Sequence, residues 1–209
     1  MKKNVVLLFL FILWLVPLKT HPLRQIIMPN KRSTAIIIRE REVQASRYML
    51  VRKLTRGQIA PTEAFEIVNA VEKYCNVSSL TKEDVLAMIW QESRFKKNAI
   101  GLVNKRDHGL MQINKTTFNW LLYTKRISNV TWGDMFTIEK NVYVGCTLLK
   151  VHEAELIRYG VQDKRLLRNI LIESYNKGVG GALFSLKYGF TFDYLEAVEK
   201  KLTAMEVLL

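Results

Sequence analysis

The stretch "MIWQESRFKKNAIGLVNKRDHGLMQI", Met88 to Ile113, places one glutamate within an apolar helical pattern and follows it with a polar loop and a Gly-Leu-Met-Gln turn. Glu92 follows Val85 by seven residues and Ile89 by three, which places all three side chains on one face of a helix. The sequence therefore predicts that Glu92 lies on the stripe that faces the core.

A buried glutamate has a direct chemical consequence. Burying an ionised carboxylate without a partner costs several kcal/mol, so the group is expected to raise its pKa and to keep its proton near neutral pH. A carboxyl group of this kind can act as the general acid that protonates a glycosidic oxygen. The alternative is a glutamate at a frayed helix end that pairs with Arg94 or Lys96. Periodicity alone leaves both interpretations open.

The rest of the chain is also mainly helical in pattern. Most periodic segments repeat at three to four residues, which predicts an all-α domain of about six helices joined by short connections. Thr81 and Asp84 form a capping box that starts one helix at Lys82. The other predicted helices run over 61–75, briefly after the Gly-Leu-Met-Gln turn, from a cap at Asn141 to Gly160, from Lys164 to Gly178, and from Phe192 to Met205.

The N-terminus has the features of an export signal. Lys2 and Lys3 precede an apolar run from Val5 to Leu18. Its length suits a signal peptide better than a membrane span, which needs about 20 residues, but no small-residue cleavage site follows. Residues 1–20 are therefore predicted to be either a cleaved signal peptide or a membrane anchor. A basic arm or linker, 21–60, is expected next, and the catalytic domain is expected to occupy 61–209.

The positive charge is concentrated in the arm. Of the formal net charge of +13, the first 60 residues hold twelve Lys and Arg against two acidic residues, while the remainder holds twenty against seventeen. Such an arm is expected to bind anionic surfaces by charge alone, a membrane surface among them, and it predicts no specific nucleic-acid partner. A solvated linker is the alternative, and an amphipathic helix within the arm can either lie on a membrane or pack on the domain. Basic residues after an apolar segment also tend to stay in the cytoplasm, which conflicts with export.

The cysteines and histidines predict no metal site and no cofactor. Cys75 and Cys146 can form a disulfide in an oxidising compartment, with buried free thiols as the alternative. His21, His108 and His152 are scattered, without the spacing of a metal motif. His108, next to the turn, is expected to face solvent.

Four motifs in order resemble those of the soluble lytic transglycosylase family. The family pattern is Glu-Ser-x-Phe, Gly-Leu-Met-Gln, Asn-Ile-x-x-Gly and Ala-Tyr-Asn-x-Gly, and the resemblance covers about residues 82–200. The matching segments are Glu92–Phe95, Gly109–Asn114, Asn141–Gly145 and Ser174–Gly178. The sequence is most similar to the small, specialised peptidoglycan-cleaving enzymes of secretion systems and phage.

The resemblance implies a lysozyme-like α fold with Glu92 as the only catalytic carboxylate. Members of the family cleave the β-1,4 bond between MurNAc and GlcNAc without water. The acid protonates the leaving oxygen and then removes the proton of the C6 hydroxyl, which produces a 1,6-anhydro-MurNAc end. An obvious second acid is therefore not expected, unlike in most glycoside hydrolases.

Other motif residues are expected to contact the substrate. Gly109 would let the backbone approach a sugar closely, and Gln112 would offer a donor and an acceptor to an acetamide or lactyl group. Core packing is an alternative for two further residues of the set, Met111 and Tyr194. The predicted substrate-binding residues are Ser93, Gly109, Met111, Gln112, Tyr175, Asn176 and Tyr194.

The chain also departs from the family pattern. Many relatives carry a serine and an Ala-Gly pair before Gly-Leu-Met-Gln, whereas this chain has "VNKRDHGLMQI", so that serine has no counterpart. Ser174 replaces the usual alanine and Val142 the usual isoleucine.

Two other functions remain open. The first is a hydrolase of the goose-type lysozyme kind, with the same fold and acid. The second is a non-catalytic protein that only binds peptidoglycan. All three imply peptidoglycan glycan strands as the partner and a location outside the cytoplasm, in the periplasm or cell wall, with a secretion system or a phage particle as an expected assembly.

Overall fold

The computed structural model describes residues 31–102 and 105–208. The chain divides into two compact units, Met1–Arg39 and Glu40–Leu209, and the second contains every element discussed below except the start of α2. The predicted signal or anchor, with the first ten residues of the predicted arm, lies outside the described residues. Among the described helices, none combines the length and the apolar character that crossing a membrane requires.

The all-α prediction is confirmed. Helices make up most of the described chain, and the short strands β1 and β2 pair antiparallel on either side of the Gly-Leu-Met-Gln turn. The elements in order are α2 Lys31–Leu54, α3 Pro61–Tyr74, α4 Lys82–Ser93, β1 Asp107–His108, β2 Ile113–Asn114, α5 Lys115–Tyr123, the 3-10 helix η1 Trp132–Phe136, α6 Ile138–Arg158, α7 Lys164–Tyr188 and α8 Asp193–Glu206.

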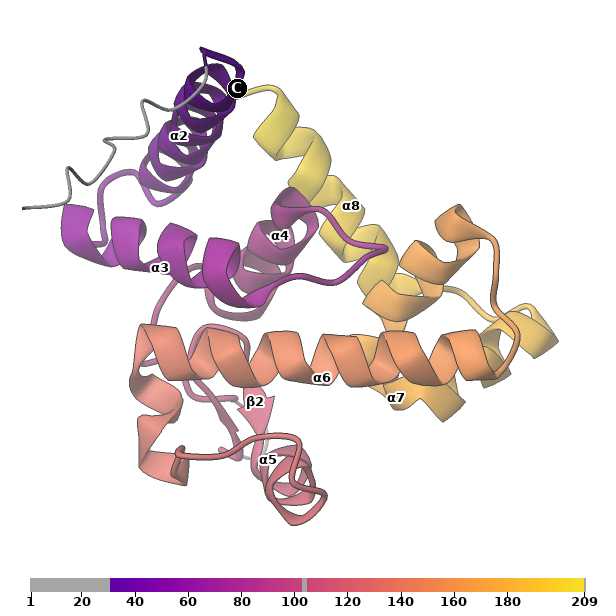
Figure 1. The fold of residues 1–209 in the computed structure, drawn as a ribbon. Helices are drawn as coiled ribbons and strands as arrows, with labels where there is room; N and C mark the ends of the chain where they lie inside the picture. Colours follow the sequence, from indigo (N-terminus) through magenta and orange to yellow (C-terminus); the bar gives the residue numbers. More distant parts are fainter. Residues whose placement is uncertain (1–30, 103–104, 209) are drawn as a thin grey trace, which may run out of the picture. The chain divides into compact units, whose positions relative to one another are not determined.

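Helix α6 is the central element of the Glu40–Leu209 unit. It packs against α3 and against α7, while α8 packs against α4 and α7 (Figure 1). A disulfide between Cys75, at the end of α3, and Cys146, within α6, joins two of these helices, with 5.1 Å between the Cα atoms. The disulfide, rather than buried free thiols, is therefore what the structure contains.

The second half of α2 belongs to this unit. Leu50 and Val51 are buried in its core. Arg47 forms ion pairs with Glu72 and, at 2.7 Å, with Glu83. Of the two predicted roles for an amphipathic helix here, packing on the domain is the one observed for residues 40–54. The compact unit thus begins well before the boundary predicted at residue 61, because this segment contributes apolar side chains to the core.

One helix boundary differs from its prediction. Asn141 does not cap α6, which begins at Ile138 after Thr137, so Asn141 lies within the first turn. The predicted break at Gly178 is confirmed: its φ of +71° and ψ of 163° are not helical, and a second helical segment of α7 continues from there to Tyr188. The helix resumes because the next residues again supply a buried face, with Val179 and Ala182 in the core.

Candidate active site

Helix α4 is fixed at both ends, and this places Glu92 in its last turn. The predicted capping box is present: Thr81 Oγ1 accepts from the Asp84 N–H, and Asp84 Oδ2 accepts from the Thr81 N–H. Buried Asp84 also pairs with Arg168 of α7 at 2.6 Å. At the other end, Arg94 adopts a left-handed conformation, with φ of 54°, and turns the chain away. The site is thereby built on a rigid element.

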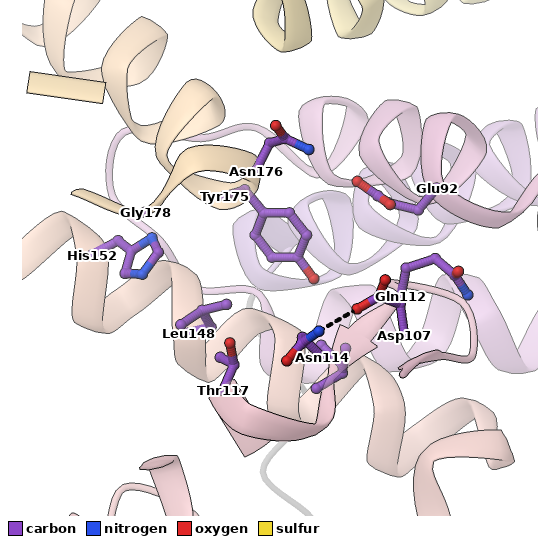
Figure 2. A pocket seen from close by; sticks show the side chains of 11 residues that line it. Glu92, Asp107, Gln112, Asn114, Thr117, Leu148, His152, Tyr175, Asn176 and Gly178 are labelled. Atoms are coloured by element: carbon purple, nitrogen blue, oxygen red, sulfur yellow. Dashed lines mark hydrogen bonds between the residues drawn. The ribbon is translucent and has the colours of Figure 1, made fainter. Parts of the chain in front are cut away.

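The Glu92 carboxyl group is half-buried and borders a cavity of about 470 Å³. Figure 2 shows Glu92 and Tyr175 approaching this cavity from opposite sides. Burial raises the pKa of Glu92 to about 7; the negative charge of Asp107 adds to this rise, and a hydrogen bond from Tyr194 opposes it. Glu92 therefore keeps its proton much closer to neutral pH than an ordinary glutamate does.

The hydrogen-bond partner of Glu92 is Tyr194 of α8. The Tyr194 hydroxyl donates to Glu92 Oε1 at 2.6 Å, whereas the alternative interpretation had the carboxyl paired with Arg94 or Lys96. The Tyr194 ring is 8% exposed, and its centroid lies 6.4 Å from that of Tyr175. Tyr194 is thus both a packed side chain and a direct neighbour of the acid.

A buried glutamate, Glu173, holds the start of α8 and with it Tyr194. Glu173 of α7 is fully buried and pairs with Lys177 at 2.9 Å. Its second oxygen accepts from the Leu195 N–H, also at 2.9 Å. The start of α8 is therefore tied to α7, which positions Tyr194 against Glu92.

The side chain of Asn141, on α6, binds the backbone of the Gly-Leu-Met-Gln turn. Its Oδ1 accepts from the Met111 N–H at 2.8 Å, and its Nδ2 donates to the carbonyls of His108 and Met135, both at 2.9 Å. Asn141 is 1% exposed. The Asn141 amide thus satisfies two backbone groups at the turn and one of η1, which ties the turn to both α6 and η1.

Gly109 and Met111 of the turn contact other parts of the protein, where contacts with a sugar were expected. A Cβ at Gly109, which has φ of +80°, would overlap the Met135 carbonyl and the Asn141 side chain. Met111 is 1% exposed and packs on Gly145, which agrees with the core-packing alternative. Both residues shape the turn instead of lining the cavity.

Gln112 and Tyr175 line the cavity and also hold it together. The Gln112 amide donates to the carbonyls of Gly109 at 2.9 Å and Ala99 at 3.2 Å. The Tyr175 hydroxyl donates to the Met111 carbonyl at 2.7 Å. Asn176 is exposed and lies on the cavity wall, as Figure 2 shows. Substrate contact by these three residues stays a prediction.

Ser93 is placed differently from its prediction. It is 6% exposed, and its hydroxyl donates to the Ile89 carbonyl one turn earlier in α4, at 3.1 Å. This internal bond turns Ser93 away from the cavity, so the structure gives no support for substrate binding.

His108 does not face solvent as predicted. Its ring stacks between Trp132, at 4.5 Å, and Phe136, at 4.6 Å. The neighbouring 3-10 helix supplies both rings, and that packing was invisible in the local sequence.

Sequence reasoning missed a second acid at the cavity. Asp107 lies on its wall, and Asn114 Nδ2 donates to Asp107 Oδ1 at 2.7 Å across the β1–β2 pair (Figure 2). A second acid thus lies at the cavity, while Glu92 as the only catalytic carboxylate stays a prediction. The available signal was the placement of Asp107 and Asn114 two residues outside either end of Gly-Leu-Met-Gln.

An α-helical domain with a half-buried glutamate of raised pKa, facing a polar cavity, has the chemical features of an enzyme that cleaves glycosidic bonds by general acid catalysis. The family model for the transglycosylase SLT domain matches residues 69–195, more than half of the chain. The chain therefore belongs to this family of lysozyme-like soluble lytic transglycosylases. No curated protein matches it.

Family membership supports lytic transglycosylase activity on peptidoglycan. It implies glycan strands as the substrate and action outside the cytoplasm. Among the residues that the structure describes, no group of histidine, cysteine and acidic side chains is arranged to hold a metal ion.

Proposed function

We propose that this protein cleaves the β-1,4 bond between MurNAc and GlcNAc in peptidoglycan and leaves a 1,6-anhydro-MurNAc end, with Glu92 as acid and then as base. The observation that carries the proposal is the half-buried Glu92 with its pKa raised to about 7, on the wall of a cavity large enough for sugars. A general acid works best when its pKa lies near the working pH.

The hydrogen bond from Tyr194 decides which oxygen of Glu92 carries the proton. Because the Tyr194 hydroxyl donates to Oε1, the acidic proton resides on Oε2. Oε2 gives this proton to the glycosidic oxygen as the C1–O bond breaks. Glu92 is then a carboxylate, which Tyr194 stabilises, since hydrogen bonds to charged acceptors are stronger than those to neutral ones.

The second half of the reaction returns the proton. The cation at C1 of MurNAc is stabilised by the acetamide of the same sugar, and the C6 hydroxyl then attacks C1. Glu92 Oε2 removes the C6 hydroxyl proton in this step, so the enzyme ends in its starting state. The product differs from a hydrolysis product by one water.

Asp107 makes hydrolysis a second candidate function. A carboxylate that faces the cavity can orient a water for attack on C1, as in two-carboxylate glycosidases, and Asn114 holds Asp107 in one orientation. In the transglycosylase proposal, its negative charge instead stabilises the positive charge that develops on the sugar. The same carboxylate therefore serves either outcome.

Mass analysis of the products separates these functions. Sacculi are digested with the full-length protein, and the released muropeptides are weighed. Anhydro products are expected, whereas products one water heavier would favour the hydrolase. Glu92→Gln keeps the shape and removes the proton donor, with Glu206→Gln as a matched control, because Glu206 is exposed at the end of α8. Solubilisation by Glu92→Gln at the rate of the control would contradict the catalytic assignment. A wild-type protein that binds sacculi without releasing anything would favour the non-catalytic binder.

We also propose that residues 1–20 direct the protein out of the cytoplasm, as a signal peptide or as an anchor. The part of the basic arm that precedes the compact unit, residues 21–39, would then hold the protein near an anionic surface such as a membrane or a secretion or phage assembly. Sequencing the N-terminus of the protein recovered from expressing cells distinguishes the two fates of the segment. An intact N-terminus in a soluble cytoplasmic fraction would contradict both the signal peptide and the membrane anchor.

A further inference from the structure

A second cavity lies beside the catalytic one. Its volume is about 330 Å³, within the range of ligand sites, and it shares Thr117, Leu148 and His152 with the catalytic cavity. Its remaining wall residues are Thr116 and Trp120 of α5. The two cavities therefore adjoin across one wall, which Figure 2 shows from the catalytic side with Thr117, Leu148 and His152.

Helix α6 brings this second cavity into line with the catalytic one. Asn141, Gly145, Leu148 and His152 follow one another at spacings of three and four residues, so they form one stripe along the helix. The stripe first supports the Gly-Leu-Met-Gln turn and then continues as the wall of both cavities. A linear polymer that lies over the catalytic cavity can thus extend onto the second.

The surroundings of Ser174 favour one tautomer of His152. His152 is 9% exposed, and its Nδ1 lies 3.1 Å from the Ser174 hydroxyl oxygen. That hydroxyl has one proton, and the Leu171 carbonyl lies 2.8 Å away to accept it. With the proton on that bond, Nδ1 donates to Ser174, and Nε2 keeps its lone pair as an acceptor. Burial lowers the pKa of His152 to about 4, so the ring stays neutral at neutral pH.

Ser174 is the residue at which the chain departs from the alanine of the family motif. It is fully buried and contacts His152, so the departure has a structural purpose within this pair. An alanine would leave the ring free to adopt the other tautomer.

We propose that Trp120, Thr117 and His152 form an additional sugar-binding subsite, which holds an N-acetylated sugar of the glycan strand next to those at the scissile bond. The substrate class rests on the proposed function. The Trp120 side chain is 42% exposed and offers an aromatic face for the apolar face of a pyranose. Thr117 offers a hydroxyl as donor and acceptor, and His152 Nε2 accepts from a sugar hydroxyl or from the acetamide N–H.

Calorimetric binding tests the subsite without requiring turnover. The full-length protein carries Glu92→Gln, so that oligomers stay intact, and is titrated with β-1,4-linked N-acetylglucosamine oligomers of two and six sugars. Adding Trp120→Ala is expected to weaken binding of the hexamer about tenfold and to leave binding of the dimer unchanged. Tyr123→Ala is the matched control, since Tyr123 lies on the same helix, is 88% exposed and is not on the cavity wall. Hexamer affinity equal to that of the Tyr123→Ala variant would overturn the subsite.

The tautomer provides a second, independent readout. Nitrogen NMR of the His152 ring is expected to show a proton on Nδ1, and Ser174→Ala should shift this equilibrium and weaken the hexamer about threefold. A proton on Nε2 in the Glu92→Gln protein would remove the acceptor on which the proposal depends. If neither the dimer nor the hexamer binds, glycan binding by the whole cavity is contradicted. If the hexamer binds and Trp120→Ala leaves its affinity unchanged, only the subsite is overturned.

Discussion

Replacing Tyr194 by phenylalanine tests how the acid is tuned. The substitution removes the hydroxyl that donates to Glu92 Oε1 at 2.6 Å and keeps the buried ring. That hydrogen bond favours the carboxylate and lowers the pKa of Glu92, whereas burial and the charge of Asp107 raise it. A hydrogen bond to a charged group contributes about 1.5 to 3 kcal/mol, and 1.36 kcal/mol corresponds to one pH unit.

The expected result is an altered pH profile. Cleavage requires protonated Glu92, so wild-type activity should fall as pH rises through about 7. In Tyr194→Phe, the pH at which activity falls to half should rise by about one unit or more. The maximal rate should drop, because the carboxylate formed during the reaction loses the hydroxyl that stabilises it. Initial rates of sacculus solubilisation between pH 5 and 9 measure both effects.

Tyr175→Phe is the control for the shifted limb. The Tyr175 hydroxyl donates to the Met111 carbonyl and not to Glu92, so its removal should leave the limb near its wild-type position even if the rate changes. An unmoved limb in Tyr194→Phe, or equal movement in both variants, would refute the reasoning about the hydrogen bond.

Three further predictions concern stability. Because the pKa of Glu92 is raised in the folded protein, stability is lost as pH rises from about 4.5 to about 7. Glu92→Gln should therefore have a higher free energy of unfolding than wild type at pH 8, by up to about 3 kcal/mol and by less where solvent screens the group, and nearly the same value at pH 4. Denaturant unfolding curves at both pH values measure the difference. Reducing the disulfide, whose cysteines are 71 residues apart, should cost about 4 kcal/mol, seen as a lower denaturant midpoint with a thiol reductant. Gly145→Ala should lower the free energy of unfolding by about 1 to 3 kcal/mol and lower activity, because the added methyl group overlaps Met111. Gly180→Ala, which has open space around it, should leave the free energy of unfolding unchanged; thermal melting and solubilisation assays compare the two variants.

The helices were largely predictable because their information is local. Apolar spacing and the Thr81–Asp84 capping box located α3, α4 and α8 to within a residue or two. The start of α6 was placed at Asn141 because asparagine is a good cap, yet the tertiary bonds of that side chain to the turn prevailed over its local preference. The break at Gly178 was predictable because glycine readily adopts positive φ, whereas the second helical segment of α7 beyond it was not.

The site was predictable in its centre and not in its surroundings. Glu92 followed from a charged residue on an apolar stripe, which is a local signal. The hydrogen-bond partner that tunes it comes from a remote segment, since Tyr194 lies 102 residues further along the chain. Elsewhere on the cavity wall, the contact of His152 with Ser174 spans 22 residues. Spacing in one sequence does not reveal such contacts, so the burial of Ser93 and Met111 and the role of Asp107 became visible only in the folded chain.

The most direct measurement is a carbon NMR titration of the Glu92 side-chain carboxyl, assigned by the loss of its signal in Glu92→Gln. The account predicts a midpoint near pH 7. A midpoint near 4.5, the ordinary value of a glutamate in water, would contradict the claim that this group retains its proton for catalysis.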